Sequence, residues 1–198
     1  MTSTQPFSAV LLAGGQSSRM GVDKAGLVID GEPLWQRQLA KLRATGAEEI
    51  FISGRADGPY AASGLAIVED ATPDAGPLAG IEAALRLAKH DWLLVLAVDL
   101  PDVPAELLAQ LIADAMAGKA GLVPSRADWL QPLAAVYPRT CLALATQCLA
   151  GENRSMRRFF RLARKAKLAD VSPVSDAEQA LFRNLNTPAD LVPDAPVE

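Results

Sequence analysis

Short hydrophobic runs alternate along the chain with segments of helical periodicity, and this alternation is typical of an α/β protein. The runs at Ser8–Leu12 and at residues 92–98 lack polar alternation, which predicts strands covered by helices on both faces. The run at 92–98 is the most hydrophobic and is predicted to be a central strand. We therefore predict a three-layer, doubly wound, mostly parallel sheet.

The same patterns predict the remaining elements. Further strands are expected at residues 50–53, 65–69, 121–125, 132–137 and, as an edge strand, 168–171. Helices are expected at residues 33–45, after Gly76-Pro77, at 104–117, at 139–149, and from a cap at Asn153 to about residue 164. Because we find no repeat and no linker of domain size, we expect one domain over residues 1–198, with residues 1–6 and 192–198 frayed.

Composition narrows the class of protein. The 198 residues carry 19 Lys and Arg against 23 Asp and Glu, a net charge of −4, which argues against a dedicated binder of nucleic acid or of a membrane surface. Hydrophobic residues make up 50% and charged residues 21%, so intrinsic disorder is excluded. Two cysteines and one histidine, His90, exclude a disulfide scaffold and a multi-histidine metal site.

We expect neither a signal peptide nor a membrane span. Residues 1–7 have neither the basic nor the long apolar region of a signal peptide, and the run at 92–98 is too short to cross a bilayer. We therefore expect a soluble, cytoplasmic protein with reduced thiols.

A glycine-rich loop, residues 11–24 (LLAGGQSSRMGVDK), follows the first strand, where α/β sheets commonly bind ligands. Gly14 and Gly15 allow the backbone to approach a ligand and to turn its amides toward it, while Arg19 and Lys24 add positive charge. This composition favours a polyphosphate site, although the order of residues fits neither a P-loop nor G-x-G-x-x-G. The alternative is a surface turn with solvated Arg and Lys side chains.

Asp99 follows the predicted central strand directly. A carboxylate at that place is either a magnesium ligand, which needs only one or two carboxylates beside phosphate oxygens and water, or a helix cap. On the residues alone both interpretations of Asp99 stay open, while the nearby Asp102 is assigned to capping the next helix.

The loop L-A-G-G-x-S-x-R-M-G-x-D-K resembles the signature of the molybdenum cofactor guanylyltransferases, within the nucleotidyltransferase superfamily. Later segments are similar to further motifs of that family, in the same order along the chain. They are an Asp at 70 followed by G-P-L-A-G at 76–80, D-x-P at 99–101, Q-P-L at 131–133 and N-x-N-T-P at 184–188. The resemblance covers nearly the whole chain and implies a Rossmann-like nucleotidyltransferase fold.

The resemblance also implies site residues. The catalytic set it implies is Arg19, Lys24 and Asp99, with Mg²⁺ on Asp99. The nucleotide-binding set it implies is Leu12, Ala13, Gly14, Gly15, Lys24, Ser53, Asp70, Gly80 and Asp99. On the pterin side it implies Gln131, Asn184 and Asn186. Ser53 stands where several members carry an Asn that contacts guanine, so the base contact departs from the family pattern there.

The implied reaction transfers GMP from GTP to molybdenum-loaded molybdopterin and releases pyrophosphate. The implied protein partners are the molybdenum-insertion protein and chaperones of acceptor molybdoenzymes. Two alternatives differ in class: a cytidylyl- or sugar-phosphate nucleotidyltransferase, and a non-catalytic nucleotide- or pterin-binding adaptor. L-A-G-G in place of L-A-A-G, together with G-P-L-A-G, favours GTP over CTP.

For two further features of the sequence, a purely structural role is the simpler explanation. The basic stretch 154–167 alternates with apolar residues, so it is either a solvated amphipathic helix with its aromatic side in the core or a docking site for an acidic carrier or a substrate phosphate. Cys141 and Cys148 are expected in the core.

Overall fold

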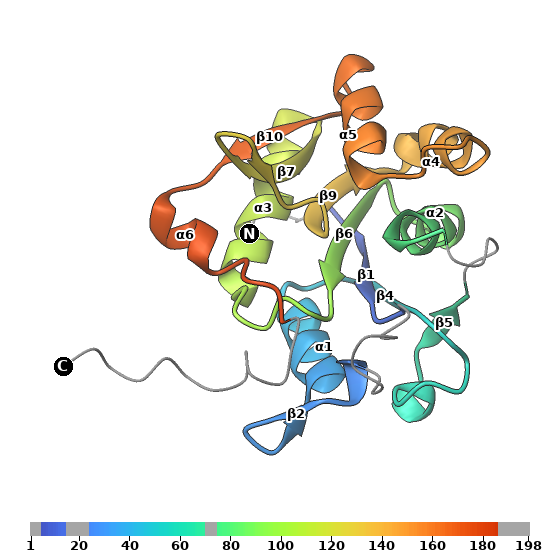
Figure 1. The fold of residues 1–198 in the computed structure, drawn as a ribbon, viewed down its shortest axis with the longest axis vertical. Coiled ribbons are helices and arrows are strands. Elements are labelled where there is room, and N and C mark those ends of the chain that lie inside the picture. Colours follow the sequence, from blue (N-terminus) through green and yellow to red (C-terminus); the bar gives the residue numbers. More distant parts are fainter. Residues whose placement is uncertain (1–4, 15–23, 70–74, 186–198) are drawn as a thin grey trace.

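The computed structural model of the protein describes residues 5–14, 24–69 and 75–185, and its centre is a mixed sheet between two layers of helices (Figure 1). In that part of the chain, eight strands form the main sheet, seven of them in the order β10-β7-β9-β6-β1-β4-β5 with β8 paired to β7. The strands are β1 (Ser8–Leu12), β4 (Glu49–Ser53), β5 (Ala66–Val68), β6 (Trp92–Ala97), β7 (Gly121–Arg126), β8 (Trp129–Leu130), β9 (Ala134–Pro138) and β10 (Ala169–Pro173).

The predicted mostly parallel α/β sheet is confirmed. β1 is parallel to both of its neighbours, β4 and β6, whereas β9 is antiparallel to β6 and to β7. All residues of β1 and β6 are buried, because helices cover both faces of the sheet at its centre. β10 lies at one edge of the sheet, as the sequence predicts.

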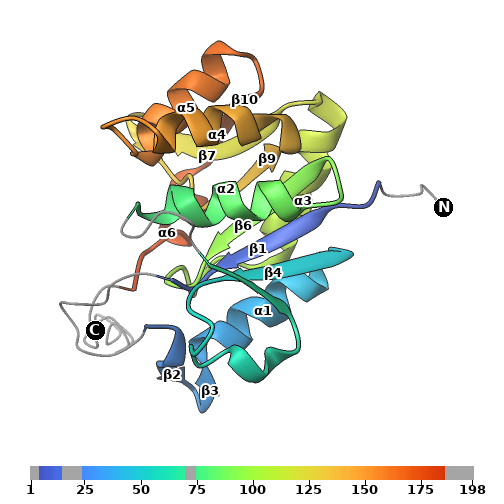
Figure 2. The same cartoon turned by 90° about the vertical axis from the view of Figure 1, so that its right-hand side faces the viewer.

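The helices divide between the two faces of the sheet (Figure 2). On one face α1 and α3 contact each other and the sheet, and on the other α2, α4 and α5 follow one another in contact. The bounds are α1 (Leu34–Ala44), α2 (Pro77–Leu87), α3 (Ala105–Gly118), α4 (Leu142–Leu149), α5 (Met156–Lys165) and α6 (Asp176–Ala180), with short 3₁₀ helices η1 (Lys24–Gly26), η2 (Ala61–Ser63) and η3 (Arg139–Cys141). No helix in the described ranges has the length and apolar character that crossing a membrane requires.

Three local predictions differ from the structure. Ser155, not Asn153, caps α5: its side chain accepts from the Arg158 N–H, while Asn153 Oδ1 accepts from Ser155. Asp102 does not cap α3, whose N-cap is Pro104 without a side-chain hydrogen bond, and Asp102 instead lies 3.6 Å from Arg183 Nη2. The segment predicted as one helix over 139–149 is divided into the 3₁₀ helix η3 and the α-helix α4.

A small hairpin also escaped prediction. β2 (Val28–Ile29) and β3 (Glu32–Pro33) pair around Asp30 and Gly31, which both take positive φ, 52° and 82°. An Asp-Gly pair is a strong signal for such a tight turn. The strands are only two residues long, so hydrophobic alternation does not reveal them. The predicted frayed ends, residues 1–6 and 192–198, lie almost wholly outside the described residues.

Candidate active site

The site lies at the carboxyl ends of β1, β4 and β6, which meet at one edge because these three strands are parallel. Leu12 and Ala13 are buried at the end of β1, and Gly14 is exposed beyond them. The next residues of the glycine-rich loop, including Gly15 and Arg19, lie outside the described residues. The predicted position of the loop at this edge is thus seen for residues 11–14 and for its last residue, Lys24.

The backbone of Gly14 does not face outward as the sequence interpretation expected. The N–H groups of Ala13 and Gly14 both donate to the carbonyl of Ser53, at 2.8 Å each, because hydrogen bonding between β1 and β4 continues past the end of the strand. A Cβ on Gly14 would lie 3.2 Å from the Gly54 Cα. Gly14 therefore allows two chain segments to approach closely, and its amide is not directed at a ligand.

Three distant segments converge beside this edge. The Nζ of Lys24 lies 3.8 Å from Asp99 Oδ2 and donates to the carbonyl of Leu185 at 2.8 Å. The N–H of Leu185 in turn donates to the carbonyl of Asp99 at 2.8 Å. The structure thus brings together Lys24 and Asp99, as the sequence predicts. The exposed Asn184 directly precedes Leu185 in the chain.

The surroundings of Asp99 disfavour the charged form of its carboxyl. Burial raises the pKa of its carboxyl, while the Lys24 ammonium and hydrogen bonds favour the charged form and offset part of that effect. The side chains of Lys24 and Asp99 are each 22% exposed, so both still reach solvent. A carboxylate that is partly desolvated and partly compensated gains from a further cation placed against it.

The side chains that could coordinate a metal ion decide which ion the site can hold. In the described ranges, no group of three or more His, Cys, Asp and Glu side chains is gathered to hold a metal. A transition-metal site is therefore not built from these residues. Magnesium is different, because it is commonly held by one or two carboxylates while phosphates and water supply the other oxygens. Asp99 suits that coordination.

Two residues that the sequence analysis missed hold the Asp99 loop in place. Gln38 on α1 is fully buried, and its amide NH₂ donates to the carbonyls of Ala97 and Leu100, at 3.2 and 2.7 Å. One turn further, Lys41 donates to the carbonyl of Pro101. The sequence does carry a signal for Gln38, since it interrupts the apolar stripe of α1 midway between Leu34 and Leu42.

Burial also affects Lys41. The pKa of Lys41 falls to about 8, first because the ammonium is desolvated and then because Arg37 repels it, with Asp102 acting in the opposite direction. The loop that carries Asp99 is thus fixed to α1 by two side chains on one helix face.

Ser53 and Gly80 form a tight contact behind the site. Ser53 is buried at the end of β4, and a Cβ on Gly80 would lie 2.1 Å from its Oγ and 3.1 Å from Leu12 Cδ2. Gly80 therefore permits α2 to pack against β4 and β1. A glycine here is explained by helix–sheet packing, so a nucleotide contact by Gly80 stays a prediction.

The remaining residues singled out from the sequence have other hydrogen-bond or ion-pair partners, lie in the core, or fall outside the described residues. Gln131 is buried, and its Oε1 accepts from the Leu133 N–H at 3.4 Å. Asp70 and Asn186 lie outside the described residues. His90 pairs with Glu48 at 3.6 Å. Cys141 and Cys148 are buried, as expected, and burial raises the pKa of both thiols, that of Cys141 to about 12.

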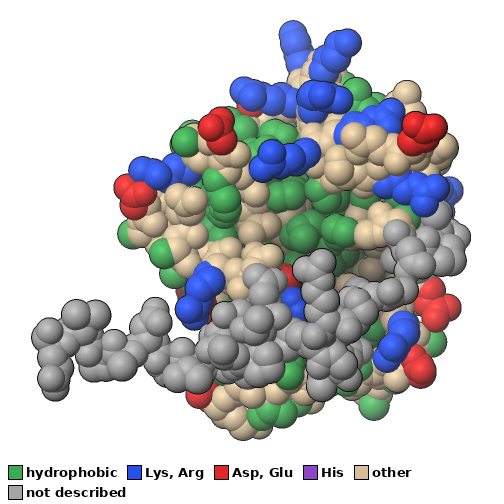
Figure 3. Space-filling model, in the orientation of Figure 1, with side chains coloured by type: hydrophobic (Ala, Val, Ile, Leu, Met, Phe, Trp, Pro, Cys, Tyr) green, Lys and Arg blue, Asp and Glu red, His purple; other side chains and the backbone are tan. Residues whose placement is uncertain are grey.

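The face that carries this edge of the sheet is hollowed (Figure 3). Hydrophobic side chains line the hollow, and Lys and Arg side chains gather along its upper margin over α5.

A profile of the family described as "MobA-like NTP transferase domain" matches residues 9–171. The chain belongs to this family.

Individual relatives agree with the family assignment. A protein of Opitutus terrae named "Probable molybdenum cofactor guanylyltransferase" is 40% identical over 187 residues, covering 93% of this chain and 92% of the relative. "Molybdenum cofactor guanylyltransferase" of Serratia proteamaculans is 34% identical over 188 residues, covering 94% and 92%. The crystal structure of Molybdopterin-guanine dinucleotide biosynthesis protein A from Archaeoglobus fulgidus superimposes with a TM-score of 0.76 at 25% identity, covering 93% of this chain and 94% of that one.

These comparisons confirm three predictions: the resemblance to the molybdenum cofactor guanylyltransferases, the Rossmann-like α/β fold, and a nucleotidyltransferase enzyme. Of the predicted nucleotide residues, Leu12 and Ser53 end β1 and β4, and Asp99 follows two residues after the end of β6, so all three lie at one edge of the sheet. The roles of single residues stay predictions.

Proposed function

We propose that this protein transfers GMP from GTP to the terminal phosphate of molybdenum-loaded molybdopterin, forming the molybdopterin guanine dinucleotide and releasing pyrophosphate. The observation that carries the proposal is the meeting of Lys24 and Asp99 beside the end of β1, in a chain whose relatives are named for this activity over more than nine-tenths of its length. GTP is a nucleotide of the cytoplasm, so we propose the reaction takes place there.

The chemistry suits a site without a general base. An oxygen of the molybdopterin phosphate attacks the α-phosphorus of GTP, the bond from that phosphorus to the bridging oxygen breaks, and pyrophosphate leaves with the electron pair. A phosphate monoester has a second pKa of about 6, so it is already largely ionised at neutral pH. Catalysis then depends on in-line positioning and on neutralising the charge of the triphosphate.

Residues of this chain are assigned to both tasks, the positioning of the phosphates and the neutralisation of their charge. We assign the Lys24 ammonium to the phosphates, and its hydrogen bond to the Leu185 carbonyl aims it at the strand ends. Asp99 would hold Mg²⁺, which when bound neutralises charge on the triphosphate oxygens. Gln38 and Lys41 keep the Asp99 loop in position through the carbonyls of Ala97, Leu100 and Pro101.

The remaining assignments follow the resemblance. We propose that Leu12, Ala13, Gly14, Ser53 and Gly80 bind the nucleotide, together with Gly15 and Asp70 from outside the described residues. Arg19, also outside them, is assigned to the phosphates beside Lys24. Gln131, Asn184 and Asn186 are assigned to the pterin side. A non-catalytic adaptor is less favoured, because a pure binder has little use for a desolvated carboxylate beside a lysine at the phosphate position.

The test is pyrophosphate release from the purified protein with Mg²⁺, molybdenum-loaded molybdopterin and either GTP or CTP, with the pterin product identified by mass spectrometry. We expect release with GTP and a guanine dinucleotide product. Release with CTP alone would keep the reaction class and overturn the base assignment. Binding of GTP with no release from either nucleotide would overturn the proposal in favour of an adaptor or another acceptor.

A further inference from the structure

The face of α5 turned away from the core carries a row of positive charges. Its aromatic side is buried through Met156, Phe159 and Phe160, which confirms the expected amphipathic helix. The opposite side is basic, and Arg157, Arg161 and Lys165 follow one another at a spacing of four residues, so each lies next to a like charge. Such a row weakens the helix unless an anion lies against it.

A groove runs along this row. Its volume is about 420 Å³. Leu130 and the small exposed part of Phe160 line its apolar side, and Arg157, Arg161, Arg164 and Lys165 provide its cationic wall. Asp128 is the one acidic residue in the lining. The groove therefore combines an apolar strip with a strongly positive margin, in a protein whose net charge is −4.

Few of these cations are neutralised by the side chains that the structure describes. Arg164 Nε pairs with Asp170 Oδ1 at 3.0 Å. Across residues 5–14, 24–69 and 75–185, Arg157, Arg161 and Lys165 form no ion pair, and neither does Asp128. Three free cations above an apolar strip are complementary to carboxylates placed around an apolar side chain.

We infer that this groove, lined by Leu130, Phe160 and the cations of α5, is a docking site for an acidic segment of a partner protein that presents Asp or Glu on both sides of a leucine-like side chain. The inference does not depend on the proposed reaction. It gives the basic stretch the protein-docking role, and not the role of binding the substrate phosphate.

Other anionic partners fit the groove less well. Phe160 is 5% exposed, so no aromatic face is open for the bases of a nucleic acid to stack on. The apolar side of α5 is already in the core and is unavailable to enter a membrane surface.

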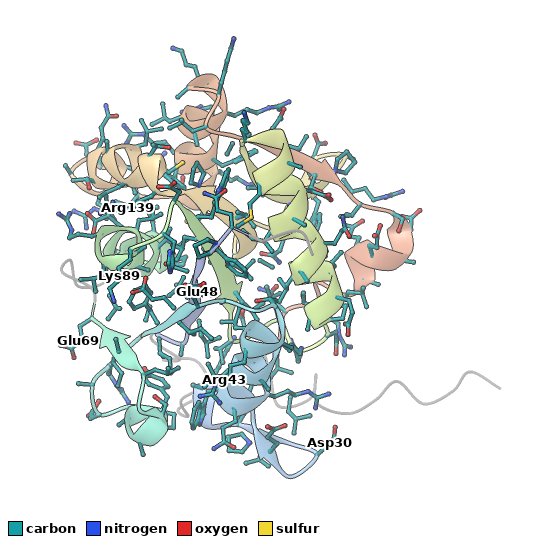
Figure 4. The ribbon with its side chains drawn as sticks, turned by 180° about the vertical axis from the view of Figure 1, so that it is seen from behind. Asp30, Arg43, Glu48, Glu69, Lys89 and Arg139 are labelled. Carbon is teal, nitrogen blue, oxygen red and sulfur yellow. The ribbon has the colours of Figure 1, made fainter. Side chains whose placement is uncertain are left out.

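The experiment measures binding of a fluorescein-labelled helical peptide of about 18 residues, with Glu along one face and Leu along the other, to the full chain by anisotropy. The test variant is Arg157→Gln/Arg161→Gln/Lys165→Gln. The matched control, Arg43→Gln/Lys119→Gln/Arg139→Gln, removes the same charge elsewhere; Figure 4 labels Arg43 and Arg139 in the view from behind.

We expect the wild type and the control to bind alike, and the test variant to bind about tenfold more weakly or worse. Affinity should fall as salt rises, and a peptide with Ala in place of Leu should bind more weakly. Turnover with free GTP and molybdopterin should stay at the wild-type level in the test variant, so failure of the docking site is separable from failure of the proposed function.

Four results would overturn the inference. They are equal binding by the test variant, equal binding of the Ala peptide, a raised KM for molybdopterin in the test variant, or tighter groove-dependent binding of a single-stranded RNA oligonucleotide or of phosphatidylserine vesicles than of the Leu peptide. Circular dichroism of both variants checks that they remain folded.

Discussion

Lys24 and Asp99 come together through a third segment: Lys24 donates to the carbonyl of Leu185, and the N–H of Leu185 donates to the carbonyl of Asp99. The ammonium and the carboxylate are therefore held 3.8 Å apart by backbone contacts as well as by their own attraction. Both side chains stay partly exposed, so the pair contributes little to stability. Burial disfavours the charge on Asp99, so a role of this pair in catalysis explains its presence at the ends of the central strands better than a role in folding does.

Removing either charge should therefore lower turnover sharply and leave the fold intact. We expect Lys24→Ala and Asp99→Asn to lower kcat about 10²- to 10³-fold, because each removes charge stabilisation of the reacting phosphates. Pyrophosphate release at saturating GTP and Mg²⁺ measures the effect. The exposed changes Lys119→Gln and Asp114→Asn are the controls. A near-normal rate in Lys24→Ala or Asp99→Asn would remove that residue from the mechanism.

Gln38 should matter for both stability and the metal requirement. Replacing it by Met keeps its volume but leaves the carbonyls of Ala97 and Leu100 without their donor, which should lower the free energy of unfolding by about 1–3 kcal/mol. Because those carbonyls flank Asp99, we also expect the Mg²⁺ concentration for half-maximal rate to rise. Urea unfolding and Mg²⁺ titration test the two effects. Gln36→Met, at an exposed position of the same helix, should change neither.

The contact between Gly80 and Ser53 predicts a non-additive pair of substitutions. Gly80→Ala places a methyl group 2.1 Å from Ser53 Oγ and should destabilise the protein by about 1–3 kcal/mol. Ser53→Ala removes that oxygen, so the double variant should recover part of the loss. Denaturant unfolding of the four proteins measures the coupling. Gly118→Ala, where a Cβ meets nothing within 4 Å, is the control. Strict additivity would show that the two residues do not clash.

Glu49 predicts a loss of stability in acid. Burial alone would raise the pKa of its carboxyl, but hydrogen bonds from the Lys89 N–H and the Ser8 hydroxyl, and the Lys89 charge, lower it overall. A lowered pKa in the folded state stabilises the protein above the unfolded-state pKa, and this contribution is lost as pH falls through the folded-state value.

The matching variant is Glu49→Gln. It should lower the free energy of unfolding by about 1 kcal/mol at pH 7, and the difference from the wild type should shrink as the pH falls below 4. Urea unfolding at pH 7, 5 and 3.5 measures it. Glu152→Gln, at an exposed position, serves as the control. A difference that grows toward acid would contradict the direction of the shift.

Prediction from sequence succeeded where a local pattern is enough. The buried runs 8–12 and 92–98 identify the two central strands, and helical periodicity locates α1, α2, α3 and α5. It failed where a contact between distant segments decides. The amide of Gly14 donates to Ser53, Asp102 pairs with Arg183 in place of capping α3, and Gln38 reaches across to the loop after β6. None of these partners is near in sequence.

The sequence by itself determined the class of fold, the glycine-rich loop after β1 and the carboxylate after β6, because hydrophobic periodicity and turn chemistry depend on neighbouring residues. Only the tertiary structure decided that Lys24, Asp99 and Leu185 meet, and that three cations of α5 line a groove with Leu130 and form no ion pair with the side chains described. The physical reason is that parallel strands bring distant loops to one edge of the sheet, and side-chain contacts across that edge depend on packing that no local pattern encodes.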